Sequence, residues 1–168
     1  MAYETTTVPV SRSQESIRDL LRHHGATTIS FAEQFLDDTS DPGKAGSAGV
    51  EFVHDDTKVR VFVSIKSPDP KAVRDKVKRA RSKTEEQIVA ELVEQEARRI
   101  WRVLHWTLKA RMEAVAENVE TFEQAFLPHI VDPATNVTLW ERIRGVVEAG
   151  ALRIGGPGLR ALEAGGQQ

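Results

Sequence analysis

A long run of helical periodicity, from residue 84 to about residue 118, constrains the fold of this chain more than any other feature. Its apolar side chains recur about every 3.7 residues, which is typical of a straight helix packed on several sides and not of a two-stranded coiled coil. The apolar strip consists of Val89, Val93, Ala97, Ile100, Leu104, Leu108 and Val115, bordered by Trp101 and Met112 on one side and by Leu92, Val103 and Trp106 on the other. We therefore expect a central helix about 50 Å long. It is expected to start at Thr84, which has capping-box spacing to Gln87.

Upstream of this helix, the sequence predicts one helix and three strands. Ser11 begins the first helix as an N-cap, and Gly25 ends it. Residues 27–32, 50–53 and 59–65 are rich in β-branched and aromatic side chains, and the last of these segments alternates strictly. We expect a three-stranded antiparallel sheet in which residues 50–53 and 59–65 form a hairpin. A polar, mobile loop is expected at about residues 37–49.

Downstream of the long helix, the patterns are shorter. Residues 121–126 and 138–147 have helical spacing, and residues 149–168 are rich in glycine. The chain thus divides into a flexible lead at residues 1–10, a single domain at residues 11–148 and a mobile tail. The expected fold class is α+β, with a small three-stranded antiparallel sheet packed on a long central helix and additional shorter helices.

Composition excludes several classes of protein. The 168 residues carry a formal net charge of −2, which excludes a protein that is basic overall but allows a local basic patch. The absence of cysteine excludes disulfides, thiolate metal sites and a cysteine nucleophile. No apolar run reaches the roughly 20 residues that span a bilayer, and residues 1–10 lack a signal-peptide pattern. We therefore expect a cytoplasmic protein with no membrane association.

Residues 71–83 form the strongest cluster of charge. Seven of these thirteen residues are basic, and they are Lys71, Arg74, Lys76, Lys78, Arg79, Arg81 and Lys83. Such a segment can follow a phosphate backbone, with affinity that salt weakens. The competing interpretation is a solvated helix face.

The aromatic residues divide into two groups. The spacing of Trp101, Trp106 and Trp140 indicates packing in the core. Phe62 is expected on the outer face of the sheet beside Arg60 and Lys66, an arrangement that suits base stacking but also suits burial under a helix.

Arg111 is predicted near the middle of the apolar strip of the long helix. A buried charge without a partner would cost several kcal/mol, so we expect an ion pair with Glu120 or Glu123. Two alternatives are open. Arg111 could line a cleft that binds an anion, or the apolar strip could be exposed to solvent at this point along the helix.

A group of acids follows, with partly helical spacing: Glu113, Glu117, Glu120 and Glu123, with His129 beyond them. Carboxylates with a histidine can hold Mg²⁺ or Mn²⁺ for phosphoryl chemistry. Ordinary solvated helix charge explains the same pattern, and no metalloenzyme motif or phosphate-binding loop accompanies it. We therefore expect no cofactor.

Recognisable motifs occur at residues 101–104 (WRVL), 109–115 (KARMEAV), 121–131 (TFEQAFLPHIV), 8–14 (VPVSRSQ) and 17–27 (IRDLLRHHGAT). In these stretches the chain resembles a family of short, uncharacterised proteins of tailed bacteriophages and prophages. The resemblance implies a phage-encoded protein of the bacterial host cytoplasm that acts around DNA metabolism. It implies no catalytic residue and no cofactor.

Three functions follow as hypotheses. The first is a non-enzymatic phage accessory protein that binds DNA, or a DNA-processing protein, through residues 71–83 with Arg60 and Lys66 nearby. The second is a homo-oligomeric interaction module that associates through surplus apolar area of the long helix, to modulate a host factor. The third and least favoured is a metal-dependent enzyme using Glu113, Glu120, Glu123 and His129.

Overall fold

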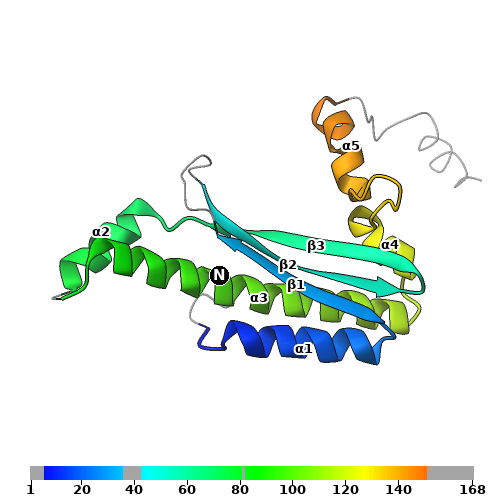
Figure 1. Cartoon of the computed structure of the whole chain (residues 1–168), viewed down its shortest axis with the longest axis horizontal. Helices are drawn as coiled ribbons and strands as arrows, with labels where there is room; N and C mark the ends of the chain where they lie inside the picture. Colours follow the sequence, from blue (N-terminus) through cyan, green and yellow to red (C-terminus); the bar gives the residue numbers. More distant parts are fainter. Residues whose placement is uncertain (1–5, 36–42, 81, 151–168) are drawn as a thin grey trace, which may run out of the picture.

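The computed structural model describes residues 6–35, 43–80 and 82–150. In chain order, its elements are α1 (Val10–His23), β1 (Thr28–Phe35), β2 (Lys44–His54), β3 (Thr57–Lys66), α2 (Pro70–Arg79), α3 (Glu85–Ala116), α4 (Phe122–Phe126), the 3₁₀ turn η1 (Leu127–His129) and α5 (Leu139–Glu148). The strands form one antiparallel sheet in the order β1-β2-β3, and α1 and α3 lie together on one face of it (Figure 1). The predicted α+β fold is confirmed.

The core lies between this face of the sheet and the two helices. Alternate strand residues point into it, as the period of two requires. The buried side chains include Ile17 and Leu21 of α1, Val50 and Phe52 of β2, Val59, Val61 and Ile65 of β3, and Ile100, Trp101, Leu104, Leu108 and Met112 of α3. The sheet therefore has an inner face that is buried and an outer face that α1 and α3 do not cover.

The central strand is longer than its sequence pattern indicates. β2 begins at Lys44, so the loop predicted at residues 37–49 is wrong from residue 44 onward, and residues 37–42 lie outside the described ranges. Gly46 and Gly49 lower the strand propensity of this segment. They are needed because a Cβ at either position would collide with a backbone carbonyl of a neighbouring strand, Gln34 for Gly46 and Val61 for Gly49. Close pairing on both sides therefore overrides local propensity.

The long helix starts where the sequence predicts it. Thr84 and Gln87 form a complete capping box, and α3 then runs unbroken to Ala116, two residues short of the expected end. Its buried face is rotated from the predicted strip, because Ile88, Trp101 and Met112 are fully enclosed while Val89 and Val115 are only half-buried. The rotation follows from the position of the sheet and α1, which both pack on that side.

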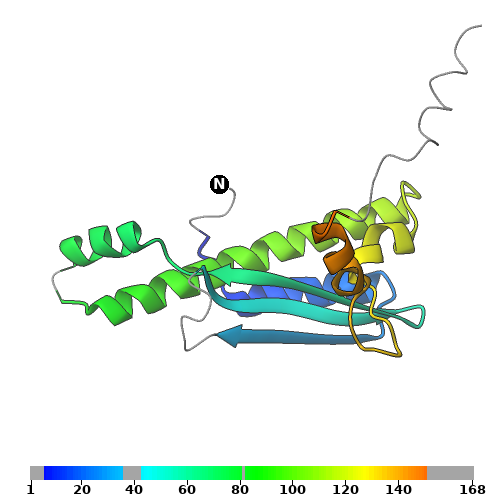
Figure 2. The same cartoon turned by 90° about the horizontal axis from the view of Figure 1, so that it is seen from above.

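Helix α2 is a separate element that lies beyond the end of the sheet. Both views show it running beside the first turns of α3, away from the rest of the molecule (Figure 2). Val73 is its buried anchor. At Ala80 the backbone becomes extended, so α2 ends there and α3 is a separate helix.

The C-terminal segment covers one edge of the sheet. Ile130 bridges Val59, and the backbone N–H of Val131 donates to the carbonyl of Lys58 at 2.9 Å. The chain then reaches α5, which lies on the outer side of the sheet at the end carrying the β2–β3 hairpin (Figure 1). None of the residues of α5 is buried.

Two tryptophans depart from the predicted packing. Trp106 is 39% exposed and Trp140 is 44% exposed, whereas Trp101 is fully buried. Helical spacing placed all three on apolar strips, but only the strip that faces the sheet receives a partner among the described elements.

The N-cap of α1 is Pro9, two residues before the predicted Ser11 cap, and the helix begins at Val10. Residues 1–5 of the predicted lead and residues 151–168 of the predicted tail lie outside the described residues. Within the described ranges, no helix combines the length and apolar character needed to cross a bilayer.

Candidate nucleic-acid interface

Helix α2 presents most of the predicted basic segment to solvent. Asp69 caps the helix by accepting a 2.9 Å hydrogen bond from the backbone N–H of Lys71, and Pro70 occupies the first turn, where its missing donor costs nothing. Basic residues fill the last turn, where the helix dipole favours them. The exposed cations of α2 are Lys71, Arg74, Lys76, Lys78 and Arg79.

Within the part of the chain that the structure describes, these five cations form no ion pairs. No carboxylate of the described residues lies within salt-bridge distance of any of them. Lys83 differs, because it forms an ion pair with Glu91 of α3. The hydrogen bond from Lys83 lowers the pKa of Glu91, and the charge of Lys76 adds to this effect. Arg81 lies outside the described residues.

Arg60 is separated from this surface. Its Nε donates to Glu51 at 2.9 Å, and its two terminal nitrogens donate to the backbone and side-chain oxygens of Asn136 at 3.0 and 3.1 Å. Burial acts to raise the pKa of Glu51, but hydrogen bonds from Lys58 and Arg60 outweigh it and lower that pKa. Arg60 therefore joins the sheet to the segment before α5, about 20 Å along β3 from Lys66.

Lys66 lies at the end of β3 that leads into α2, and the structure adds a lysine beside it. Lys44 is the cross-strand partner of Lys66, next to a shift in register between Lys44 and Gly46, so two cationic residues lie on adjacent strands at this end of the sheet. Sequence reasoning missed Lys44 because it placed this residue in a loop, and only the strand pairing reveals the neighbour.

Arg111 does not form the predicted ion pair with Glu120 or Glu123. Its guanidinium lies 5.6 Å from the ring centroid of Phe126, and its Nη1 is buried without a hydrogen-bond partner. The pairing fails because α4 turns its aromatic side toward α3, while Glu123 sits in the first turn of α4 near Thr121. A hydrogen bond from its own backbone N–H, with a smaller contribution from Thr121, lowers the pKa of Glu123.

His129 lies near Arg111 and not in a metal site. Burial lowers the pKa of His129, and the charge of Arg111 lowers it further, against a hydrogen bond to the backbone of Arg60. Glu113 is occupied by an ion pair with Lys109 at 3.5 Å. Across residues 6–35, 43–80 and 82–150, no three His, Asp or Glu side chains gather at metal-binding distance. Glu113, Glu120, Glu123 and His129 are therefore not brought together as a metal site.

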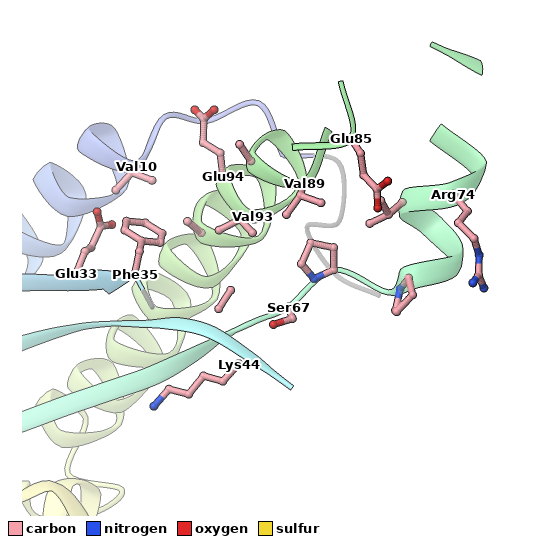
Figure 3. A pocket seen from close by; sticks show the side chains of 16 residues that line it. Val10, Glu33, Phe35, Lys44, Ser67, Arg74, Glu85, Val89, Val93 and Glu94 are labelled. Atoms are coloured by element: carbon pink, nitrogen blue, oxygen red, sulfur yellow. The ribbon is translucent and has the colours of Figure 1, made fainter. Parts of the chain in front are cut away.

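A cavity of about 840 Å³ opens between the end of the sheet, α2 and α3 (Figure 3). Its walls are mainly apolar, with Phe35, Val89 and Val93 among the lining residues. The charged lining residues are two cations, Lys44 and Arg74, and three acids, Glu33, Glu85 and Glu94. Because the acids outnumber the cations, the cavity itself is not suited to an anion, and the cationic surface is the outer side of α2.

Comparison with known proteins adds no relative. No protein-family model, no curated protein and no solved structure matches this chain. The functional assignment therefore depends on the fold and on the surface chemistry of the chain itself.

Proposed function

We propose that this protein is a non-enzymatic accessory protein that binds nucleic acid through the outer side of α2. The observation that carries the proposal is the set of five exposed cations on that helix, none of which pairs with a carboxylate of the described residues. They lie on an element that projects beyond the sheet, where a nucleic-acid backbone can reach them (Figure 2). The proposal includes a role around phage DNA metabolism in the bacterial host cytoplasm.

The charge distribution supports local binding over general attraction. The chain as a whole is slightly acidic, with a formal net charge of −2, so long-range attraction to DNA is weak. Binding then depends on short-range contacts of α2 with phosphates, each of which releases a counterion. A DNA-processing protein with an acidic surface could use the same cations.

The direct test is retardation of labelled DNA at increasing salt. We expect the intact chain to retard both single- and double-stranded oligonucleotides at 25 mM salt, with an affinity that falls steeply by 200 mM. The absence of any shift at 25 mM salt would contradict the proposal. Retention of affinity at high salt would show a mode of binding that does not use the α2 cations.

A second candidate function, self-association, is favoured by α5. Trp140, Ile143 and Val146 are each between 44% and 45% exposed and lie at helical spacing, so α5 presents an apolar face. We propose that a second copy of the protein packs on this face of α5. This proposal replaces association through the long helix α3, which the sequence suggested.

Light scattering tests this candidate. We expect a dimer or larger assembly that Ile143→Glu converts to monomers, because a charge on the apolar face is costly to bury. Ser16→Glu on the far side of the molecule is the control and should leave the assembly intact. A monomeric wild-type protein at about 100 μM would disprove the self-association model, because stable interfaces hold at that concentration.

A further inference from the structure

The outer face of the sheet has an exposed aromatic residue near its centre. Phe62 of β3 is 45% exposed, although large apolar side chains are usually withdrawn from water. In Figure 1, α5 lies over one end of this face and α2 lies beyond the other. No described helix covers the strands between them.

The ring of Phe62 rests on a surface without large side chains. Gly49 and Ala32 are aligned with Phe62 across the three strands. A Cβ at Gly49 would lie 2.7 Å from Cγ and Cδ1 of the ring, so the ring sits directly over the glycine backbone. One face of the ring is thus supported by the sheet, and the other is available to a ligand.

Toward α2 the outer face beside this ring is polar and then cationic, whereas on the other side of the ring lie Arg60 and the acids Glu51 and Glu141. Gln34, Ser47 and Ser64 form the next row of the outer face, and Lys44 and Lys66 form the row after it. A depression of about 550 Å³ includes Phe62, these three polar residues and Lys44, and it also includes Arg60 and two acids, Glu51 and Glu141. Neither lysine has an ion-pair partner among the described residues.

We propose that this face binds single-stranded nucleic acid, with an unpaired base stacked on Phe62 and the adjoining phosphates held by Lys44 and Lys66. The inference rests on the proposed nucleic-acid function and specifies the substrate class. Only an unpaired base offers its flat face to a protein ring, because the bases of a duplex are stacked on each other. The nucleic-acid strand would continue from the two lysines onto α2, which is separated by three residues from the end of β3 at Lys66.

Covering of Gly49 alone does not account for these features. An aromatic ring can shield a glycine in a sheet, and that role needs no neighbouring charge. Lys44 and Lys66 place two positive charges at the α2 end of the same face. A phosphate bound by these lysines would neutralise their charge, so one ligand would use both the exposed ring and the lysines.

The test compares single-stranded oligo(dT) with a duplex of the same length at low salt. We expect Phe62→Ala to weaken binding of the single strand by about 5- to 150-fold, the range for loss of one stacked base, and to change duplex binding less than twofold. Phe62→Trp should restore binding of the single strand. Phe62→Leu keeps an apolar side chain over Gly49 and should behave like the alanine variant.

The outcomes separate the two proposals. If the wild type binds neither nucleic acid, both proposals are wrong. If it binds both and all Phe62 variants match the wild type, stacking is wrong while binding through α2 stands. Melting curves followed by circular dichroism establish that each variant is folded, and Phe62→Leu provides the comparison if the alanine variant is unstable.

Discussion

Removing four cations from α2 is expected to abolish most of the salt dependence of DNA binding. The variant carries Lys71→Gln, Arg74→Gln, Lys78→Gln and Arg79→Gln, which retain helix-forming side chains. If each of the five α2 cations contacts one phosphate, the wild-type affinity falls about 500-fold between 50 and 200 mM salt, because each contact adds about 0.9 to the slope of log K against log salt. We expect the variant to lose only a few-fold over the same interval, starting from a much lower affinity. Fluorescence anisotropy at several salt concentrations measures both quantities.

A second variant controls for net charge. Arg12→Gln, Arg22→Gln, Lys109→Gln and Arg144→Gln remove the same number of cations from α1, α3 and α5. Both variants have the same formal charge, so a general electrostatic effect would weaken binding equally in the two. We expect the control to bind nearly as the wild type does. Equal losses in both variants would contradict a specific role for α2.

Replacing Trp101 with alanine is expected to lower the free energy of unfolding by about 3–5 kcal/mol, the usual cost of removing a large aromatic side chain from a core. Trp101 is fully buried on α3 and packs edge-to-face against Phe31 of β1, with ring centroids 5.6 Å apart. Its indole N–H donates to Glu33, so the change also leaves that carboxylate without this donor. Urea unfolding followed by circular dichroism measures this loss of stability. A loss of the expected size would support packing of the sheet on the side of α3 that carries Trp101.

Trp106→Ala is the matched control for this prediction. Trp106 lies on the same helix but is 39% exposed, and its main contacts are with Arg102, His105 and Lys109. We expect a loss of about 1 kcal/mol or less, the range for exposed cation–π contacts. A larger loss for Trp106 than for Trp101 would mean that the sheet packs on the opposite side of α3.

Local signals predicted the starts of the later helices well, although the predicted Ser11 cap of α1 was wrong. Thr84 forms the expected capping box, and Thr121 and Thr138 begin short helices with the same geometry. The hairpin between β2 and β3 also formed as expected, with Asp55 and Asp56 adopting the left-handed backbone of a tight turn. Such signals depend on residues within a few positions of each other, so a single sequence contains them.

Features that depend on distant neighbours were not predicted. The long helix has apolar residues over a wide arc, and its pattern did not show that Trp101 would be enclosed while Trp106 would not. The extension of β2 to Lys44 required pairing with both neighbouring strands. The sequence suggested Arg60 for the nucleic-acid interface because it is a basic residue near Phe62. In the structure, the loop before α5 brings Asn136 close, and Arg60 donates hydrogen bonds to it.

The sequence by itself determined that this chain forms a helix, a three-stranded antiparallel sheet and a long capped helix, because caps, turns and alternation act over short distances. It also determined that the strongest basic segment precedes the long helix. Only the tertiary structure decided that Arg111 faces Phe126, that Lys44 stands opposite Lys66, and that Phe62 lies open over Gly49. Each of these contacts joins residues from different strands or helices, and its geometry is set by how those elements pack.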